Sequence, residues 1–160
     1  MLKNITDIFI IFSAKYLLFL VIGLVLIYFL RQSKNIRKEF VIFSAFVFPI
    51  AFIISRIAAH FYYNARPFMV EGITPLIAHV ADNGFPSDHT LLGCAIAAVV
   101  FRFDRKNGVA VFLLSLIIGF SRVFAGVHHS LDIWGSVLIV LFSAIISQIL
   151  FQHYFEKKLK

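Results

Sequence analysis

The chain has 160 residues, of which 61% are hydrophobic and 14% charged, whereas soluble domains have roughly 45–50% apolar and about 25% charged residues. This composition excludes an ordinary soluble domain and predicts an all-α integral-membrane helical bundle, because lipid forces every segment to satisfy its own backbone hydrogen bonds. The net charge of +7 does not indicate a nucleic-acid partner, since membrane proteins carry basic residues in the loops that set their topology.

Apolar segments run along almost the whole chain, so we expect a single domain over residues 1–160. Residues 1–15 predict an amphipathic N-terminal segment at the membrane interface, because Asp7 and Lys15 interrupt the apolar run at helical spacing. About five transmembrane helices are then expected, at residues 16–30, 40–59, 87–103, 108–124 and 132–151.

Residues 60–86 break the apolar pattern and predict a loop that has a function. Prolines and glycines punctuate it, at Pro67, Pro75, Pro86, Gly72 and Gly84. The polar and ionisable groups that it carries beside membrane spans are costly there and indicate a functional site.

Basic residues gather at one end of the predicted bundle, which the positive-inside rule makes the cytoplasmic end. Ten of the fifteen Lys and Arg residues belong to this end: Arg31, Lys34, Arg37, Lys38, Arg102, Arg105, Lys106, Lys157, Lys158 and Lys160. The loop of residues 60–86 then faces the other side. We therefore expect a multi-pass protein of the cytoplasmic membrane whose site faces the extracytoplasmic side.

Arg66 and Arg122 stand at the outer ends of predicted spans, where two planar guanidinium groups would neutralise a dianionic phosphate. The alternative is that each arginine snorkels to a lipid headgroup. Ser87 and Asp88 follow Pro86 at the start of a helix, whose free N–H groups and dipole favour a phosphate. The same pair is also an ordinary helix cap.

His128 and Asp132 are four residues apart, so a helix would hold them on one face within hydrogen-bonding reach. The carboxylate would fix the tautomer of the imidazole and leave its other nitrogen as a nucleophile toward phosphorus. His89 would protonate the leaving oxygen and later activate water. For each histidine taken alone, a structural residue or a haem or metal ligand is the alternative.

A zinc site would need three or four protein ligands. His79, His89, His128 and His129 would have to supply them. The two arginines would repel a cation, so we expect neither a metal nor another cofactor.

The candidate residues fall in three segments: ARP at 65–67, FPSDH at 85–89 and SRVFAGVHHSLD at 121–132. In this order the segments resemble the signatures of the type 2 phosphatidic acid phosphatase superfamily, and the resemblance extends over about residues 40–151. The stretch TPLIAHVADNGFPSDHT is similar in particular to bacitracin-resistance-type undecaprenyl-diphosphatases. The resemblance implies an acid-phosphatase/vanadium-haloperoxidase-like helical core.

The same resemblance implies a metal-independent, two-step phosphatase. In it, His128 is phosphorylated, His89 is the acid and Asp132 orients His128. The phosphoryl group would be held by Arg66, Ser87 and Arg122.

The family's first signature begins with a lysine seven residues before Arg66, and Ala59 occupies that position here. Arg56 and His60 are the candidates to replace the lysine. We expect a lipid phosphatase that converts undecaprenyl diphosphate to undecaprenyl phosphate, with phosphatidate or phosphatidylglycerol phosphate as alternative substrates. A non-catalytic lipid-phosphate binder or transporter subunit is the alternative from another class. The expected partners are the lipid substrate and the bilayer, with no obligate protein partner.

Overall fold

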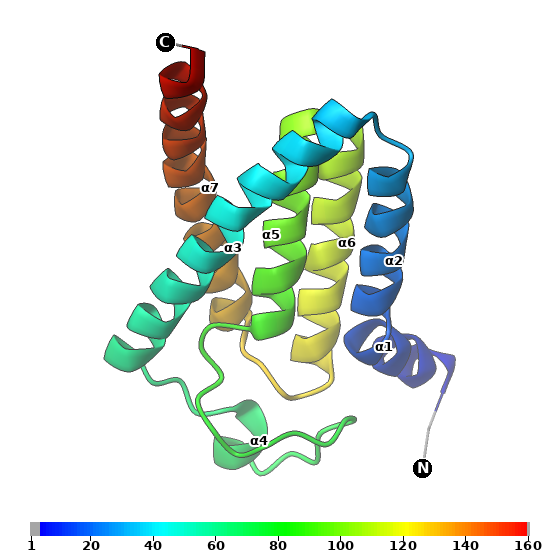
Figure 1. Cartoon of the computed structure of the whole chain (residues 1–160). Coiled ribbons are helices and arrows are strands. Elements are labelled where there is room, and N and C mark those ends of the chain that lie inside the picture. The colour runs from blue at the N-terminus through cyan, green and yellow to red at the C-terminus, as the bar shows by residue number, and fades with distance from the viewer. Residues whose placement is uncertain (1–3, 160) are drawn as a thin grey trace.

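The computed structural model describes residues 4–159, with side chains as far as Tyr154. The basic side chains expected at Lys157, Lys158 and Lys160 therefore lie outside the described residues. The described chain forms helices in the order α1 (Ile5–Lys15), α2 (Leu17–Leu30), α3 (Lys34–Phe61), α4 (Pro67–Val70), α5 (Asp88–Phe103), α6 (Arg105–Phe124) and α7 (Ser130–Leu159). The all-α fold class is thereby confirmed (Figure 1).

The number of spans differs from the expected five. Among the described residues, α3, α6 and α7 are long and apolar enough to cross a membrane, and α1 with α2 makes a fourth candidate that is bent by 51°. By itself, α2 has 14 residues and α5 has 16. At about 1.5 Å per residue both are shorter than the apolar core of roughly 30 Å, so neither meets the length of a straight span.

α5 lies at the centre of the bundle and packs against α2, α3, α6 and α7. Its buried residues are mostly small, among them Gly93, Cys94, Ala95 and Ala97. Small side chains let helix backbones approach closely in a membrane, where lipid is as apolar as the helices themselves. One apolar cluster joins α5 to α3 and α7, and a second joins it to α2 and α6.

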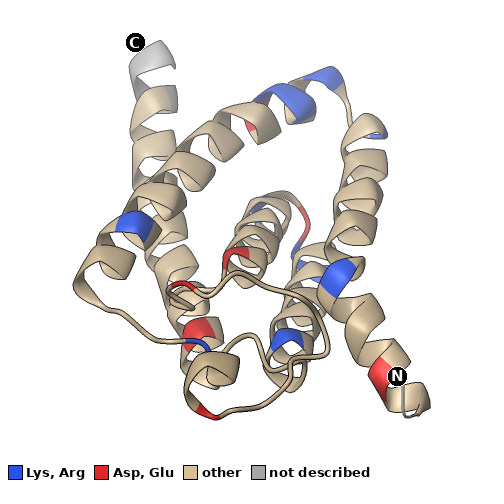
Figure 2. Ribbon diagram, turned by 90° about the horizontal axis from the view of Figure 1, so that it is seen from below, with Lys and Arg blue, Asp and Glu red and all other residues tan. Residues whose placement is uncertain are grey.

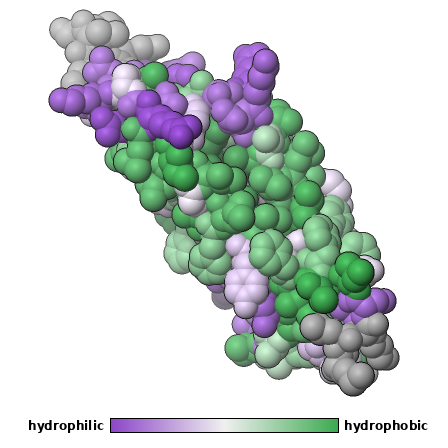
Figure 3. Space-filling view, turned by 90° about the vertical axis from the view of Figure 1, so that its right-hand side faces the viewer, coloured by the Kyte–Doolittle hydropathy of each residue, from purple (hydrophilic) through white to green (hydrophobic). Residues whose placement is uncertain are grey.

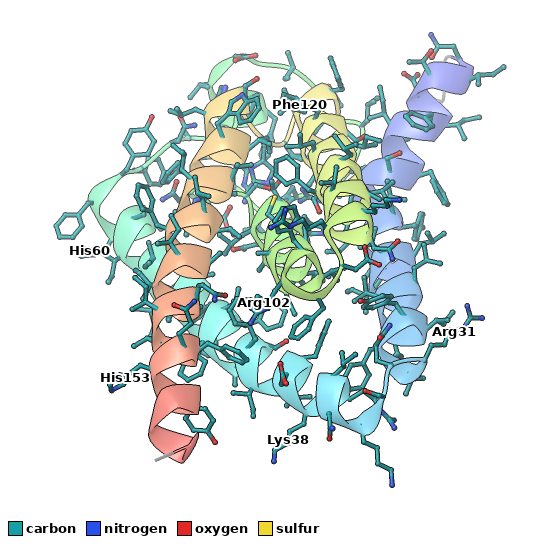
Figure 4. All side chains as sticks on the ribbon, turned by 90° about the horizontal axis from the view of Figure 1, so that it is seen from above. Arg31, Lys38, His60, Arg102, Phe120 and His153 are labelled. Carbon is teal, nitrogen blue, oxygen red and sulfur yellow. The ribbon has the colours of Figure 1, made fainter. Side chains whose placement is uncertain are left out.

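The two ends of the bundle differ in character. The long loop around α4 and the link between α6 and α7 meet at one end, whereas the α2–α3 and α5–α6 connections lie at the other (Figure 1). Arg31, Lys38 and Arg102 stand at this second end (Figure 4). A broad hydrophobic band separates the polar ends (Figure 3), as expected for a protein embedded in a bilayer.

Candidate active site

The candidate residues come together at the loop end of the bundle, although they are carried by different elements. Seen from this end, the loop passes over the ends of the helices, and acidic and basic positions lie near it (Figure 2). Gly126 has a φ of +77° just after α6. A glycine takes this left-handed conformation without strain, and it turns the chain so that residues 127–129 lie across this end before α7 begins.

His128 and Asp132 form the expected pair, with Nδ1 of the imidazole 3.2 Å from Oδ2 of the carboxylate. The helix expected to carry both residues begins only at Ser130, so His128 lies in the link before α7. Both side chains are buried, and Asp132 is fully so. The same carboxylate oxygen accepts the backbone N–H of His129 at 2.8 Å. The other oxygen accepts the amide of Asn64 at 2.7 Å. These bonds hold Asp132 in one orientation and so fix the ring that it contacts.

Arg66 lies on the opposite side of the His128 ring. Its Nη1 is 3.2 Å from Nε2 of His128 and donates to the carbonyl of Val127 at 2.8 Å, while its Nε donates to Asp82 at 2.7 Å. Because a guanidinium can only donate, Nε2 accepts and the ring proton sits on Nδ1, facing Asp132. The nitrogen that carries the electron pair therefore faces the candidate phosphate-binding arginine and accepts a hydrogen bond from it.

The environment of His128 also keeps its ring neutral. Burial lowers the pKa of His128 below its usual value, with Arg122 and Arg66 acting in the same direction, while the hydrogen bond to Asp132 opposes the change. A neutral imidazole retains the electron pair that a nucleophile needs.

Arg122 is buried near the end of α6. Its Nη1 donates to the backbone carbonyl of Ala14 in α1 at 3.0 Å, and its Nε has no hydrogen-bond partner. His89, on the first turn of α5, lies within electrostatic range of Arg122 and His128. The structure thus brings both arginines and both histidines to one region.

Ser87 is the N-cap residue of α5 at the same site and is fully buried, but its side chain makes no capping hydrogen bond to the helix. Its hydroxyl accepts from Thr90 at 3.1 Å, and its backbone N–H donates to the carbonyl of Asp132 at 3.3 Å. Asp88 differs, because its carboxylate is exposed and pairs with Arg56 at 2.7 Å. At Asp88, a phosphate would bind to the backbone N–H groups at the start of α5, because the carboxylate itself repels an anion.

The two candidates to replace the motif lysine differ in where their side chains lie. Arg56 is engaged with Asp88, so its charge is partly neutralised. His60 is exposed, stacks edge-on against Phe61 and lies at the outer edge of the bundle (Figure 4). The backbone carbonyl of Ala59 accepts from the amide of Asn83 at 3.2 Å. Of the two, only Arg56 is linked to a residue of the FPSDH segment.

Sequence reasoning missed Asn64 and Asn83, and it considered His79 only as a zinc ligand. Asn83 joins both sides of the loop, because its side chain accepts from the backbone N–H of Asn64 and Phe85 and donates to the carbonyl of Tyr62. The ring of His79 lies 6.0 Å from that of His128, centre to centre. Asn83 lies just before the FPSDH segment in sequence, whereas Asn64 is 68 positions from Asp132, so only folding brings that amide to the motif.

Within the described residues, no group of three or more His, Cys, Asp or Glu side chains is arranged to hold a metal ion. The four histidines considered for zinc do not converge: the ring of His129 instead contacts the carbonyl of Ala65 at 3.0 Å.

Comparison with known proteins gives consistent matches. A model of the PAP2 superfamily matches residues 57–156. The bacitracin transport permease protein BcrC of Bacillus licheniformis is 36% identical over 136 residues, which cover 84% of this chain and 66% of that protein. The undecaprenyl-diphosphatase BcrC of Bacillus subtilis (strain 168) is 30% identical over 139 residues, which cover 87% of this chain and 72% of that protein.

The chain thus spans slightly less than two thirds of the Bacillus licheniformis relative's length. Among solved structures, LpxE of Aquifex aeolicus has the same fold, with a TM-score of 0.70 and 24% identity over 92% of this chain and 87% of that one. All three signature segments lie within the matched residues 57–156. The chain therefore belongs to the PAP2 superfamily.

Proposed function

We propose that this protein is a membrane phosphatase that removes phosphate from a lipid phosphate or diphosphate. Undecaprenyl diphosphate is the first candidate substrate. One observation carries the proposal: His128 is buried between Asp132 at Nδ1 and Arg66 at Nε2. This arrangement orients a neutral nucleophile toward a phosphate-binding arginine. Family membership and the relative named as an undecaprenyl-diphosphatase support the same reaction class and substrate.

The proposed chemistry has two steps. In the first, the electron pair of His128 Nε2 attacks phosphorus, an N–P bond forms, and the P–O bond to the lipid leaving group breaks. His89 gives its proton to the leaving oxygen, while Arg66 and Arg122 stabilise the charge on the phosphoryl oxygens. In the second step, His89 takes a proton from water, the water oxygen attacks phosphorus, and the N–P bond breaks to release phosphate.

The residue roles can be tested with purified protein and three substrates: undecaprenyl diphosphate, phosphatidate and phosphatidylglycerol phosphate. We expect wild type to release phosphate and to form an acid-labile phosphohistidine, and His128→Ala to do neither. His153→Ala is the matched control, because His153 is exposed at the far end of α7 (Figure 4). Undiminished release by His128→Ala would refute this nucleophile.

The binder alternative makes a different prediction in the same assay. If wild type binds a lipid phosphate but releases no phosphate from any of the three substrates, the protein is a binder and the phosphatase proposal fails. The substrate panel also ranks the lipids, so a strong preference for phosphatidate would replace undecaprenyl diphosphate as the proposed substrate.

We further propose that the site faces the extracytoplasmic side of the cytoplasmic membrane. The support is the separation of the site, at the loop end, from the end with the α2–α3 and α5–α6 connections (Figure 1), where Arg31, Lys38 and Arg102 lie. Short basic connections remain on the cytoplasmic side during insertion.

A further inference from the structure

The end of α1 lies against the site, although no signature segment includes it. Ala14 packs with Ile77 of the loop and with Ala125 and Val127 of the link between α6 and α7. Its carbonyl accepts the 3.0 Å hydrogen bond from Nη1 of Arg122. α1 is therefore a wall of the region that holds the two arginines.

The break between α1 and α2 explains how this contact forms. α1 ends at Lys15, and α2 begins at Leu17 with a 51° change of direction. The last carbonyls of a helix have no partner within it, and they carry the negative end of its dipole. A cation at that end is favourable, so Arg122 both satisfies the carbonyl of Ala14 and is held in place by it.

Ser13, next to Ala14, has an unusual buried hydroxyl. Other buried serines donate to a carbonyl of their own helix: Ser115 to Val111, Ser143 to Ile139 and Ser147 to Ser143. Ser13 is only 1% exposed, yet its hydroxyl has no partner. Burying such a group unpaired destabilises a protein, so its presence beside the site needs an explanation.

Among buried side-chain nitrogen and oxygen atoms of the described residues, two lack a hydrogen-bond partner: Oγ of Ser13 and Nε of Arg122. Ser13 belongs to α1, which packs against α6, and Arg122 of α6 reaches the residue that follows Ser13. Both groups are donors, and a phosphate oxygen accepts several hydrogen bonds at once.

We propose that Ser13 is a further phosphate-binding residue, whose hydroxyl donates to the same bound phosphoryl group as Nε of Arg122. This inference rests on the proposed function, because it adds a residue of α1 to the phosphate site of that reaction. Ala14 then acts as a positioning residue: its carbonyl holds Nη1 and leaves Nε of Arg122 directed to the ligand.

The test compares wild type with Ser13→Ala, using lipid phosphate release, inhibition by inorganic phosphate, and thermal unfolding with and without phosphate. We expect KM and the inhibition constant for phosphate to rise about tenfold or more, as for a lost hydrogen bond to a charged group. The unfolding midpoint without phosphate should stay the same or rise, because the substitution removes an unpaired buried hydroxyl. The upward shift of this midpoint by phosphate should shrink.

Ser147→Ala is the matched control, because Ser147 is equally buried but its hydroxyl is paired within α7, in the half of that helix remote from Asp132. It should leave KM and phosphate inhibition unchanged. Ser13→Cys keeps the size of the side chain while replacing the hydroxyl with a weak donor, and it should weaken phosphate binding even if Ser13→Ala folds poorly.

Two results would overturn the inference while the phosphatase proposal stands. One is unchanged KM and phosphate inhibition in both Ser13 variants. The other is a lower unfolding midpoint with activity lost in proportion, which would make Ser13 a packing residue. A third result is that wild type hydrolyses no lipid phosphate, while phosphate raises its unfolding midpoint and this shift is lost in Ser13→Ala. The phosphatase proposal then fails and the anion site remains. If phosphate neither inhibits nor stabilises wild type, the anion site fails as well.

Discussion

At His128, each of the two ring nitrogen atoms contacts a different side chain. Asp132 takes Nδ1 at 3.2 Å, as the spacing of four residues predicted, and Arg66 takes Nε2 at 3.2 Å. The first contact is local in sequence, but it does not join two residues of one helix, because His128 lies in the link that precedes α7 and Asp132 in the first turn of α7. The second joins residues that are 62 positions apart. No local pattern in the sequence encodes it.

The lowered pKa of His128 predicts that its ring stays neutral at pH values where a free histidine is half protonated. Burial is the main cause. Because the folded-state pKa lies below the ordinary value of about 6.5, we expect titration of His128 in the detergent-solubilised protein to have its midpoint below pH 6.5. NMR of ring-labelled histidine measures it, with the signal assigned by its loss in His128→Gln.

Free histidine in the same buffer provides the reference for this titration. A midpoint for His128 at or above that of free histidine would contradict a neutral nucleophile. It would mean that the Asp132 contact outweighs burial and the two arginines.

Among the elements, α1 and α5 depart most from what the sequence suggested. α1 was expected as an amphipathic segment at the interface, and it does expose large apolar side chains such as Ile5 and Phe9. The C-terminal end of α1, however, packs against α6 and contacts Arg122. α5 is shorter than a straight span, yet it is the helix around which the others pack. Hydropathy reports the preference of a segment for lipid but not its partners.

The α5–α6 contact makes a prediction at Gly108, near the start of α6. A Cβ atom there would overlap the backbone of Phe101 in α5. We expect Gly108→Ala to separate these helices and lower the free energy of unfolding by about 1–3 kcal/mol, the usual cost of overpacking. Thermal unfolding in detergent measures the effect.

Gly23→Ala in α2 is the control, because no atom lies within 4 Å of a Cβ added there. It should leave the unfolding midpoint near that of wild type. Phosphate release per folded molecule should persist in Gly108→Ala, since Gly108 lies at the end of the bundle opposite the site. Equal midpoints for the two variants would refute the close α5–α6 packing.

For the whole molecule, the separation of a basic end from the site end is the feature that bears on topology. The hydrophobic band between them is the part that lipid covers (Figure 3). Cysteine labelling can test the orientation with low background, because Cys94, the chain's one cysteine, is buried.

We expect Glu71→Cys, in the exposed loop, to react with a membrane-impermeant thiol reagent in intact cells. Arg105→Cys, exposed at the basic end, should react only after lysis. The reverse pattern would place the site on the cytoplasmic side. Labelling of both variants in intact cells would show leaky cells, and the wild-type protein, which should remain unlabelled, reveals any reaction at Cys94.

The sequence by itself determined the fold class, the helical segments and the residues of the three signature segments. Composition and local spacing suffice for these, because a bilayer admits few spanning structures and helical geometry fixes which neighbours meet. Only the tertiary structure decided that Arg66 reaches His128, that Arg56 pairs with Asp88, and that α1 meets Arg122. Such contacts depend on how separate helices pack and on where α1 breaks, which no local pattern encodes.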